Sequence, residues 1–314
     1  MQPLPKGAHP CFNRAVKLSA GRVHVPVAAD CNIQCNYCNR RFDCLHESRP
    51  GVTSKLLEPE KVVPYLAYVT RYDPSLTVVG FAGPGDPLAE PEKILSIIKH
   101  VHRAFPSLLI CVSTNGLNLP ESAERLVRAG VTHVTITANT LNPEVGKRIY
   151  RWVRVDDQIF LGREGAEILI ARQWEGIQRL KQKGMIIKVN TVVIPEINDA
   201  EIETLAKKCA QYQVDLMNLV PLLPVAGTLF ATTPPLSKKE IFRLRGHAGV
   251  YVPQMTHCAR CRADAVGRLF EKQSFRFEWD TSCRSAPVCA ARADRQGTHY
   301  YCEGGWHSKR VCGS

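Results

Sequence analysis

The sequence lacks any stretch of eighteen consecutive apolar residues, and its N-terminus, MQPLPKGAHPC, has no hydrophobic signal core. These absences argue against a membrane span and against secretion, so we expect a cytoplasmic protein. Methionine is scarce, with 4 residues in 314, and we find no repeat and no low-complexity segment. Hydrophobic residues still make up 45% of the chain, enough for one large α/β domain or two ordinary ones.

Acidic residues are fewer than basic ones, 29 against 41, which gives a formal net charge of +12. Such a charge suits nucleic acid or an anionic small substrate. Lys and Arg are spread along the chain, however, with no run longer than two. The charge is therefore weak support for nucleic-acid binding, and we expect neither a nucleic-acid partner nor a membrane partner.

Cysteine is abundant, and disulfides cannot explain it. The chain has 13 cysteines, an odd number that cannot pair completely. Thiols stay reduced in the cytoplasm. A cysteine-rich cytoplasmic chain therefore points to metal.

Periodicity predicts an α/β fold. Short β-branched runs, several almost wholly apolar as in buried parallel strands, alternate with amphipathic helical patterns. Candidate strands lie at 22–29, 76–82, 108–113, 132–138, 185–193 and 215–222, and candidate helices at 59–72, 91–105, 121–130, 163–184 and 199–212. In the longest helix we expect Ile168, Ala171, Gly176, Ile177 and Leu180 to form the core-facing stripe. Six such units fall short of a closed barrel of eight, so we predict an open, partial TIM-like (β/α)6 barrel with ligands at the C-terminal strand ends.

The stretch CNIQCNYC follows the first candidate strand directly and places Cys31, Cys35 and Cys38 in Cys-x3-Cys-x2-Cys spacing. Three thiolates can hold three irons of a cubane cluster and leave the fourth iron open to a substrate. A structural zinc site would instead want four protein ligands, typically two Cys-x2-Cys pairs. Tyr37 could shield such a cluster or stack on an adenine. The residues alone thus indicate a multi-cluster iron–sulfur enzyme.

CNIQCNYC resembles the signature loop of the radical S-adenosylmethionine (SAM) enzymes. More specific segments resemble the NifB family, the maturases of the nitrogenase iron–molybdenum cofactor. These segments are HPCFNRA (9–15), HVPVAADCNIQCNYCNRRFDC (24–44), ESRPGVTS (47–54), GPGDPL (83–88), STNGL (113–117) and MTHCARCRADAVG (255–267). Together they cover about residues 8–267.

The resemblance implies a SAM-binding 4Fe–4S cluster on Cys31, Cys35 and Cys38. It also implies SAM contacts from Gly83, Gly85 and Asp86, although many radical SAM enzymes have Gly-Gly-Glu-Pro at this place. An ordinary Gly-Pro turn is the alternative there. Further SAM contacts are expected from Tyr37, Ser113, Thr114, Asn115 and Asn190.

The resemblance further implies two auxiliary 4Fe–4S clusters, three in all. The expected ligands are Cys11, His24, Cys44, Cys111, Cys258 and Cys261. We expect His24 to share one cluster with Cys44 and either Cys11 or Cys111, and the Cys258–Cys261 pair to serve the other. His24, as a labile neutral ligand, is counted among the catalytic residues. The alternative for Cys258 and Cys261 is half of a zinc knuckle with Cys283 and Cys289.

The reaction implied by the resemblance fuses two 4Fe–4S clusters around a carbide derived from SAM, with an extra sulfur. The product is the eight-iron precursor of the nitrogenase cofactor. Many NifB proteins end in a NifX-like carrier domain for which this chain has no room. We therefore expect separate cluster donors and NifX- or NifEN-type carriers as partners.

Three segments are predicted: an N-terminal extension (1–21), the barrel (22–247) and a C-terminal cluster-binding extension and tail (248–314). Glu47 and Arg49 could position ligands or form an ion pair. Cys209 fits a helix core, and Cys283, Cys289, Cys302 and Cys312 are assigned no catalytic role. Two other functions stay open: a radical SAM enzyme modifying RNA or a peptide, and a non-enzymatic zinc or iron–sulfur module.

Overall fold

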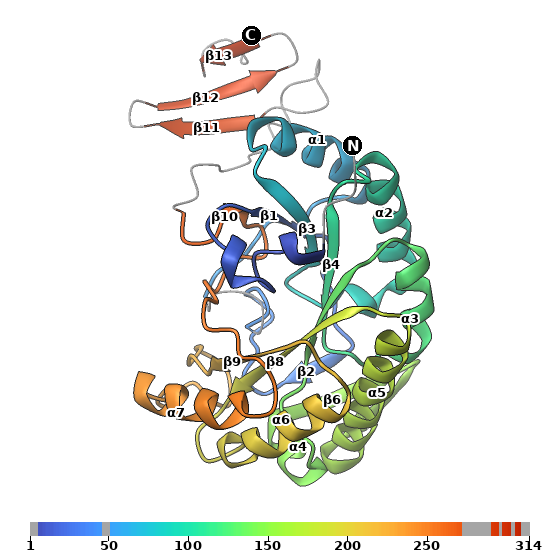
Figure 1. The fold of residues 1–314 in the computed structure, drawn as a ribbon, viewed down its shortest axis with the longest axis vertical. Helices are drawn as coiled ribbons and strands as arrows, with labels where there is room; N and C mark the ends of the chain where they lie inside the picture. The colour runs from blue at the N-terminus through green and yellow to red at the C-terminus, as the bar shows by residue number, and fades with distance from the viewer. Residues whose placement is uncertain (1–5, 46–50, 272–289, 295–296, 303–304, 309–314) are drawn as a thin grey trace.

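The protein is described from a computed structural model, which covers residues 6–45 and 51–271 and the backbone of three strands at 290–294, 297–302 and 305–308. A curved sheet lies at its centre, with helices on the convex side (Figure 1). Six parallel strands form most of this sheet: β1 (Gly21–Pro26), β3 (Leu76–Ala82), β4 (Leu109–Thr114), β5 (His133–Thr137), β8 (Ile186–Val193) and β9 (Leu216–Pro221). Each falls on a predicted strand, so the prediction of a partial barrel is confirmed.

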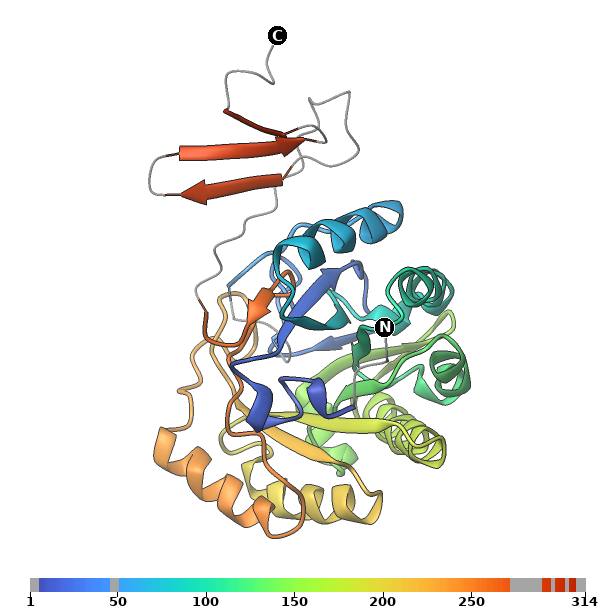
Figure 2. The ribbon, with the colours of Figure 1, turned by 45° about the horizontal axis from the view of Figure 1, so that its top comes forward.

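Helices cover the outer face of the sheet (Figure 2). Five of the described helices overlap the predicted ranges, whereas those at 143–149 and 238–249 were not predicted. The helices are α1 (Val62–Tyr72), α2 (Pro91–Ala104), α3 (Leu119–Arg128), α4 (Pro143–Ile149), α5 (Gly162–Gln182), α6 (Ile202–Gln211) and α7 (Lys238–Gly249). Within the described ranges, no helix has the length and apolar character that crossing a bilayer would require.

The two faces of the sheet differ in chemistry because alternate residues of a strand point to opposite sides. On β8, Ile187 and Val189 belong to the same apolar core as Ile177 and Leu180 of α5. Their neighbours on the other face, Lys188 and Asn190, line a cavity. The outer face therefore holds the fold together and the concave face carries the polar groups.

The core stripe of α5 differs from the prediction at one side. Gly176, Ile177 and Leu180 are buried as expected, but Ala171 is exposed and Ile168 is only half-buried. Trp174 and Leu169 occupy the core instead. The buried stripe is therefore rotated toward Leu169 and Trp174 relative to the predicted one.

The open side of the half-barrel is crossed by the segment that follows α7. It bonds to the backbone of β9 at Met217, where Met217 N donates to Pro253 O at 2.8 Å and Met255 N donates to Met217 O at 2.7 Å. The segment then reaches β10 (Val266–Arg268), which pairs antiparallel with β1 and completes the order β10-β1-β3-β4-β5-β8-β9. Residues 255–261 thus pass over the concave face from one edge of the parallel sheet to the other.

Two small sheets were not predicted. One joins β2 (Ile33–Cys35), β6 (Tyr150–Val155) and β7 (Gln158–Leu161), with Asp156 in the left-handed region at the hairpin turn. The other comprises β11 (Ala290–Asp294), β12 (Gly297–Cys302) and β13 (Gly305–Ser308). The first sheet matters for function because β2 is part of the predicted cluster loop.

Candidate active site

Two cavities open on the concave face of the sheet, and one of them is larger than the other. Thr135 on β5 lines the larger cavity, and Thr137, two residues on, lines the smaller. At the end of β4, Ser113 likewise lines the larger cavity and Asn115 lines the smaller. The cavities therefore follow one another along the strands, with the smaller at the C-terminal strand ends, where ligands were predicted.

The smaller cavity is lined by Cys31, Cys35 and Cys38, and also by Cys44. The side-chain amide of Gln34 donates hydrogen bonds to the carbonyl oxygens of Cys35 and Cys38 at 3.0 and 2.9 Å. These bonds close the loop on itself. The Cys-x3-Cys-x2-Cys motif is thus brought to a single cavity wall.

Gly83 and Gly85 allow the GPGDPL segment to touch the backbone that leads into the cysteine loop. A Cβ at Gly85 would lie 1.9 Å from the carbonyl oxygen of Asp30, and one at Gly83 would lie 2.3 Å from that of Ala28. Gly85 N also donates to Ala28 O at 3.0 Å. A side chain at either position would push the two segments apart.

Asp86 ties this segment to the STNG segment. Its buried carboxylate accepts from the Thr114 hydroxyl at 2.9 and 3.1 Å, from Leu88 N at 2.8 Å and from Asn115 N. Buried carboxylates need such donors. The role visible in the structure is to position neighbouring groups, and a direct SAM contact from Asp86 stays a prediction.

Cys31 lies between an amide and a cation. Asn115 Nδ2 approaches the Cys31 sulfur at 3.5 Å and donates to Asn32 Oδ1 at 2.7 Å. Burial raises the pKa of the Cys31 thiol and Asp86 raises it further, whereas Arg40 lowers it. Arg40 therefore favours the thiolate that iron ligation needs.

Tyr37 is 1% exposed and lies in the apolar cluster under the loop. Its hydroxyl accepts a hydrogen bond from Asn139 Nδ2 at 3.0 Å, and burial raises its pKa well above the ordinary value. The ring is well placed to shield the cysteine loop from water. Stacking on an adenine stays a prediction.

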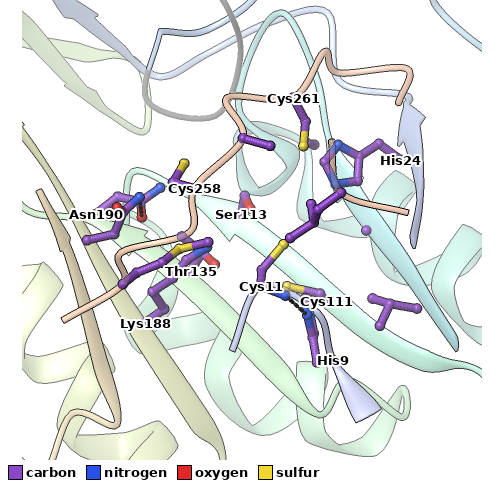
Figure 3. A pocket seen from close by; sticks show the side chains of 17 residues that line it. His9, Cys11, His24, Cys111, Ser113, Thr135, Lys188, Asn190, Cys258 and Cys261 are labelled. Carbon is purple, nitrogen blue, oxygen red and sulfur yellow. Dashed lines mark hydrogen bonds between the residues drawn. The ribbon is translucent and has the colours of Figure 1, made fainter. Parts of the chain in front are cut away.

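The larger cavity collects five predicted auxiliary ligands: Cys11, His24, Cys111, Cys258 and Cys261 (Figure 3). His24, Gly80 and Cys111 occupy one register level across β1, β3 and β4. A Cβ at Gly80 would lie 3.0 Å from His24 Cδ2. Because Gly80 has no side chain, the imidazole of His24 can extend from β1 over β3 toward Cys111 on β4.

The surroundings of His24 define its tautomer. Its Nδ1 lies 3.0 Å from the carbonyl oxygen of Arg262, which can only accept a hydrogen bond. Nδ1 therefore carries the proton, and Nε2 bears the lone pair that a metal ligand requires. This arrangement fits the predicted role of His24.

Cys11, Cys258 and Cys261 come from opposite ends of the described chain. His257 Nε2 contacts Pro10 O at 3.0 Å and so joins the two segments. Burial raises the pKa of the Cys11 thiol to about 12, Cys261 and Cys258 add to this, and Lys188 opposes it. All three thiols line the larger cavity.

Arg22 also contacts this group, through a hydrogen bond from Nη2 to the Cys261 sulfur at 3.0 Å. Its Nη1 donates to the carbonyl oxygens of Gly267 and Arg268 on β10, the latter at 3.0 Å. The guanidinium is held in place by backbone, so it presents a fixed donor to the thiol.

Not all predicted SAM contacts lie at the smaller cavity. Tyr37, Gly85, Asp86 and Asn115 line it. Ser113 and Asn190 line the larger cavity instead, and Asn190 accepts from Asn218 Nδ2 at 3.1 Å. Gly83 and Thr114 line neither of these cavities and act through the contacts described above. SAM binding stays a prediction for all eight residues.

Cys44 and His24 line different cavities, the smaller and the larger respectively. A cluster held by both would therefore lie where the two cavities meet. The predicted grouping of these two residues stays a prediction.

Sequence reasoning missed several residues of the site: Arg22, Arg40, Lys188 and His9, which lines the larger cavity. One signal was available. Lys188 and Asn190 are polar residues two apart in the apolar run MIIKVNTVV, and such spacing places both on one face of a strand. The contacts of Arg22 and Arg40 with cysteines depend on tertiary structure and leave no local pattern.

The remaining predicted residues divide into three groups. Cys209 is fully buried in the core on α6, as predicted. Glu47, Arg49, Cys283, Cys289 and Cys312 lie outside the described residues. Cys302 ends β12, of which only the backbone is described.

The possible metal ligands are spread along the walls of the two cavities. Among the described residues, no three His, Cys, Asp or Glu side chains are arranged to hold one metal ion. The thiols instead line the walls of shared cavities, as expected where each ligand reaches a different iron. Free thiols at Cys11, Cys31, Cys35, Cys258 and Cys261 remain available for this purpose.

Residues 25–209 match the Radical SAM superfamily, more than half of the chain and all of the cysteine loop. The chain belongs to the radical SAM superfamily. Membership implies a 4Fe–4S cluster and SAM as cofactors, and it confirms the superfamily predicted from CNIQCNYC. The cavity at the strand ends is thus the expected place of radical SAM chemistry.

Solved radical SAM structures share the fold. The chain is similar to Streptococcus suis SuiB bound to S-adenosylmethionine, with a TM-score of 0.55 and 14% identity over 76% of this chain and 50% of that one. It is also similar to methylornithine synthase, PylB, with a TM-score of 0.50 and 15% identity over 81% and 77%. At these identities the likeness shows the fold alone.

Curated relatives are far more similar. The FeMo cofactor biosynthesis protein NifB of Klebsiella pneumoniae is 45% identical over 285 residues, 90% of this chain and 61% of that protein. NifB of Chlorobaculum tepidum is 43% identical over 266 residues, 85% and 63%. The predicted resemblance to NifB is confirmed. The chain spans about three fifths of the length of these relatives.

Proposed function

We propose that this radical SAM protein is a maturase that builds the eight-iron precursor of the nitrogenase cofactor. The single observation that carries this proposal is a SAM-type cysteine loop directly beside a larger cavity lined by four thiols and His24. The similarity to FeMo cofactor biosynthesis proteins supports it.

In the proposed reaction, two 4Fe–4S clusters are the substrates. One SAM gives its methyl group to a cluster sulfide and leaves as S-adenosylhomocysteine. A second SAM takes one electron and splits into methionine and a 5′-deoxyadenosyl radical, which takes one hydrogen atom from that methyl group and leaves as 5′-deoxyadenosine. The other two hydrogens leave as protons, their bonding electrons staying with the carbon and the irons, as the carbon becomes a carbide between the two fusing substrates. A ninth sulfur, added as sulfide, completes the product. When bound, the resident cluster on Cys31, Cys35 and Cys38 supplies the electron that cleaves SAM.

In our proposal the six auxiliary ligands form two sets of three, one set for each substrate cluster. Cys11, Cys258 and Cys261 hold one substrate cluster, supported by the cavity that they share and by the His257–Pro10 contact that joins their segments. His24 and Cys111 hold the other with Cys44, supported by the shared register of His24 and Cys111. This makes three clusters in all, counting the SAM-binding one.

The protein's own residues position and shield. Asp86 and the two glycines of GPGDPL hold the SAM segment against the cysteine loop, and Tyr37 shields that loop from water. We further propose cluster donors and NifX- or NifEN-type carriers as partners, in the cytoplasm.

Iron and sulfide analysis with electron paramagnetic resonance (EPR), before and after SAM under strict anaerobiosis, tests the proposal. We expect about twelve irons per chain, from three four-iron clusters. An iron–sulfur species should be released after SAM is added. About four irons, or zinc with no SAM cleavage, would contradict it, and methylated RNA or peptide would support the alternative enzyme.

A further inference from the structure

The guanidinium of Arg22 contacts one of the proposed cluster ligands directly. Arg22 lies on β1 and is 5% exposed, and its Nη2 donates a hydrogen bond to the Cys261 sulfur at 3.0 Å. A guanidinium has N–H donors and no acceptor, so the sulfur must be the acceptor in this contact. A thiolate accepts such a bond more strongly than a neutral thiol, because the bond is then charge-assisted.

The other side of the same guanidinium is held by backbone. Nη1 donates to the carbonyl oxygens of Gly267 and Arg268, the latter at 3.0 Å. Both residues belong to β10, whose pairing with β1 holds them beside Arg22. The guanidinium is planar and rigid, so fixing one nitrogen on two carbonyls also fixes the direction of the other nitrogen. The fold itself therefore directs Nη2 at Cys261.

This contact leaves the cavity side of the sulfur open to iron. Of the two described residues, Cys261 lines the larger cavity and Arg22 does not (Figure 3). Hydrogen bonds to the sulfurs of an iron–sulfur cluster are compatible with iron ligation and help to set the reduction potential of the cluster. The Arg22 bond and an iron bond can therefore exist together at Cys261.

We propose that Arg22 is a positioning residue that retains the iron–sulfur cluster bound by Cys261 and raises its reduction potential. Cys11, Cys258 and Cys261 supply the bonds to iron, and Arg22 stabilises the negative charge on one of these three sulfurs. The same donor favours the added electron of the reduced cluster. This inference rests on the proposed function, because it concerns a substrate cluster of the same cavity.

The test compares the wild type with Arg22→Met, which removes the charge and the donors but keeps a long side chain. The matched control is Arg179→Met. Arg179 Nη1 also donates to a backbone carbonyl, that of Pro120 at 2.9 Å, but the residue lies on α5 and lines neither cavity described above.

Each full-length protein is made with arginine labelled with ¹⁵N in its guanidinium and is reconstituted anaerobically with ferrous iron and sulfide. Three quantities are measured. They are the rate of iron loss to a chelator, the midpoint potentials of the clusters, and the coupling of ¹⁵N to the reduced clusters by pulsed EPR.

We expect Arg22→Met to release about four of its irons roughly tenfold faster than the wild type, the ratio for the loss of one charge-assisted hydrogen bond. The midpoint potential of one cluster should fall, and the ¹⁵N coupling to that cluster should disappear. The SAM-responsive EPR signal should persist, which shows that the variant is folded. Arg179→Met should match the wild type in all three measurements.

An unchanged midpoint potential in Arg22→Met would overturn the role of Arg22 and leave the proposed function standing. This holds even if iron leaves faster, because Arg22 would then only anchor β10. An unchanged rate of iron loss would overturn retention. A wild type that binds only the SAM cluster would overturn both this inference and the proposed function. Should Arg22→Met fail to fold, Arg22→Gln offers an uncharged amide donor to the β10 carbonyls, and the same results are expected.

Discussion

Cys35 lies in the middle of the loop that lines the smaller cavity. We expect Cys35→Ala to abolish both methyl transfer and 5′-deoxyadenosine formation, because both depend on one SAM site. Chromatography of the SAM products measures each. The control is Cys209→Ala. It removes a thiol of α6 that is buried in the hydrophobic core and to which we assign no role in SAM chemistry. Survival of either activity in Cys35→Ala would contradict a shared site.

His24 is a ligand to a substrate cluster in our account, so His24→Ala should lose the carbide-containing product while SAM is still cleaved. EPR of the auxiliary clusters and assay of 5′-deoxyadenosine separate the two effects. His100→Ala, at an exposed position on α2, serves as the control. Unchanged cluster spectra in His24→Ala would remove His24 from the ligand set.

Asp86 gives a prediction about stability. In Asp86→Asn an amide NH2 group replaces one carboxylate oxygen. The NH2 group cannot accept the hydrogen bonds that Thr114, Leu88 or Asn115 donates to that oxygen. We expect a loss of about 1–3 kcal/mol in the free energy of unfolding, measured with urea on the metal-free protein. Asp157→Asn, at an exposed turn, should leave it unchanged. Equal stability of both variants would show that the network contributes nothing.

At the scale of elements, both stability and SAM binding depend in our account on the contact between the GPGDPL segment and the backbone of residues 28–30. In Gly85→Ala the new Cβ would lie 1.9 Å from a backbone oxygen that cannot rotate away. We expect a loss of about 2 kcal/mol or more in stability, and weaker SAM binding by equilibrium dialysis.

Gly246→Ala is the matched control for Gly85→Ala. Gly246 is exposed on α7, and a Cβ there meets no atom within 4 Å. Alanine should therefore stabilise the helix by about 0.5–1 kcal/mol. Normal SAM binding in Gly85→Ala would show that the two segments need not touch.

The six parallel strands were predictable because both faces of each are buried and their sequences are almost continuously apolar. The small sheet that joins β2 to the β6–β7 hairpin escaped because β2 lies more than a hundred residues away from YRWVRVDDQIFL. The same holds for the site. The local spacing of CNIQCNYC predicted the cysteine loop, whereas the Arg22–Cys261 contact spans 239 residues and leaves no trace in either segment.

At the scale of the whole molecule, the C-terminal boundary can be tested. β10 pairs with β1, and Leu269, 1% exposed, lines the larger cavity. Truncation after Glu271 keeps both, so we expect normal iron content and SAM cleavage. Truncation after Gly267 cuts β10 and should lose iron from the auxiliary clusters. Iron loss in the longer form would show that the later cysteines are ligands.

The most direct test of the central claim follows the methyl carbon of SAM. The purified chain, loaded with iron and sulfide, is incubated anaerobically with a reductant and SAM labelled with ¹³C in its methyl group. We predict that the label enters the iron–sulfur product and couples to its iron spins, with 5′-deoxyadenosine formed alongside. Label found only in methionine, or in a methylated RNA or peptide, would contradict the account.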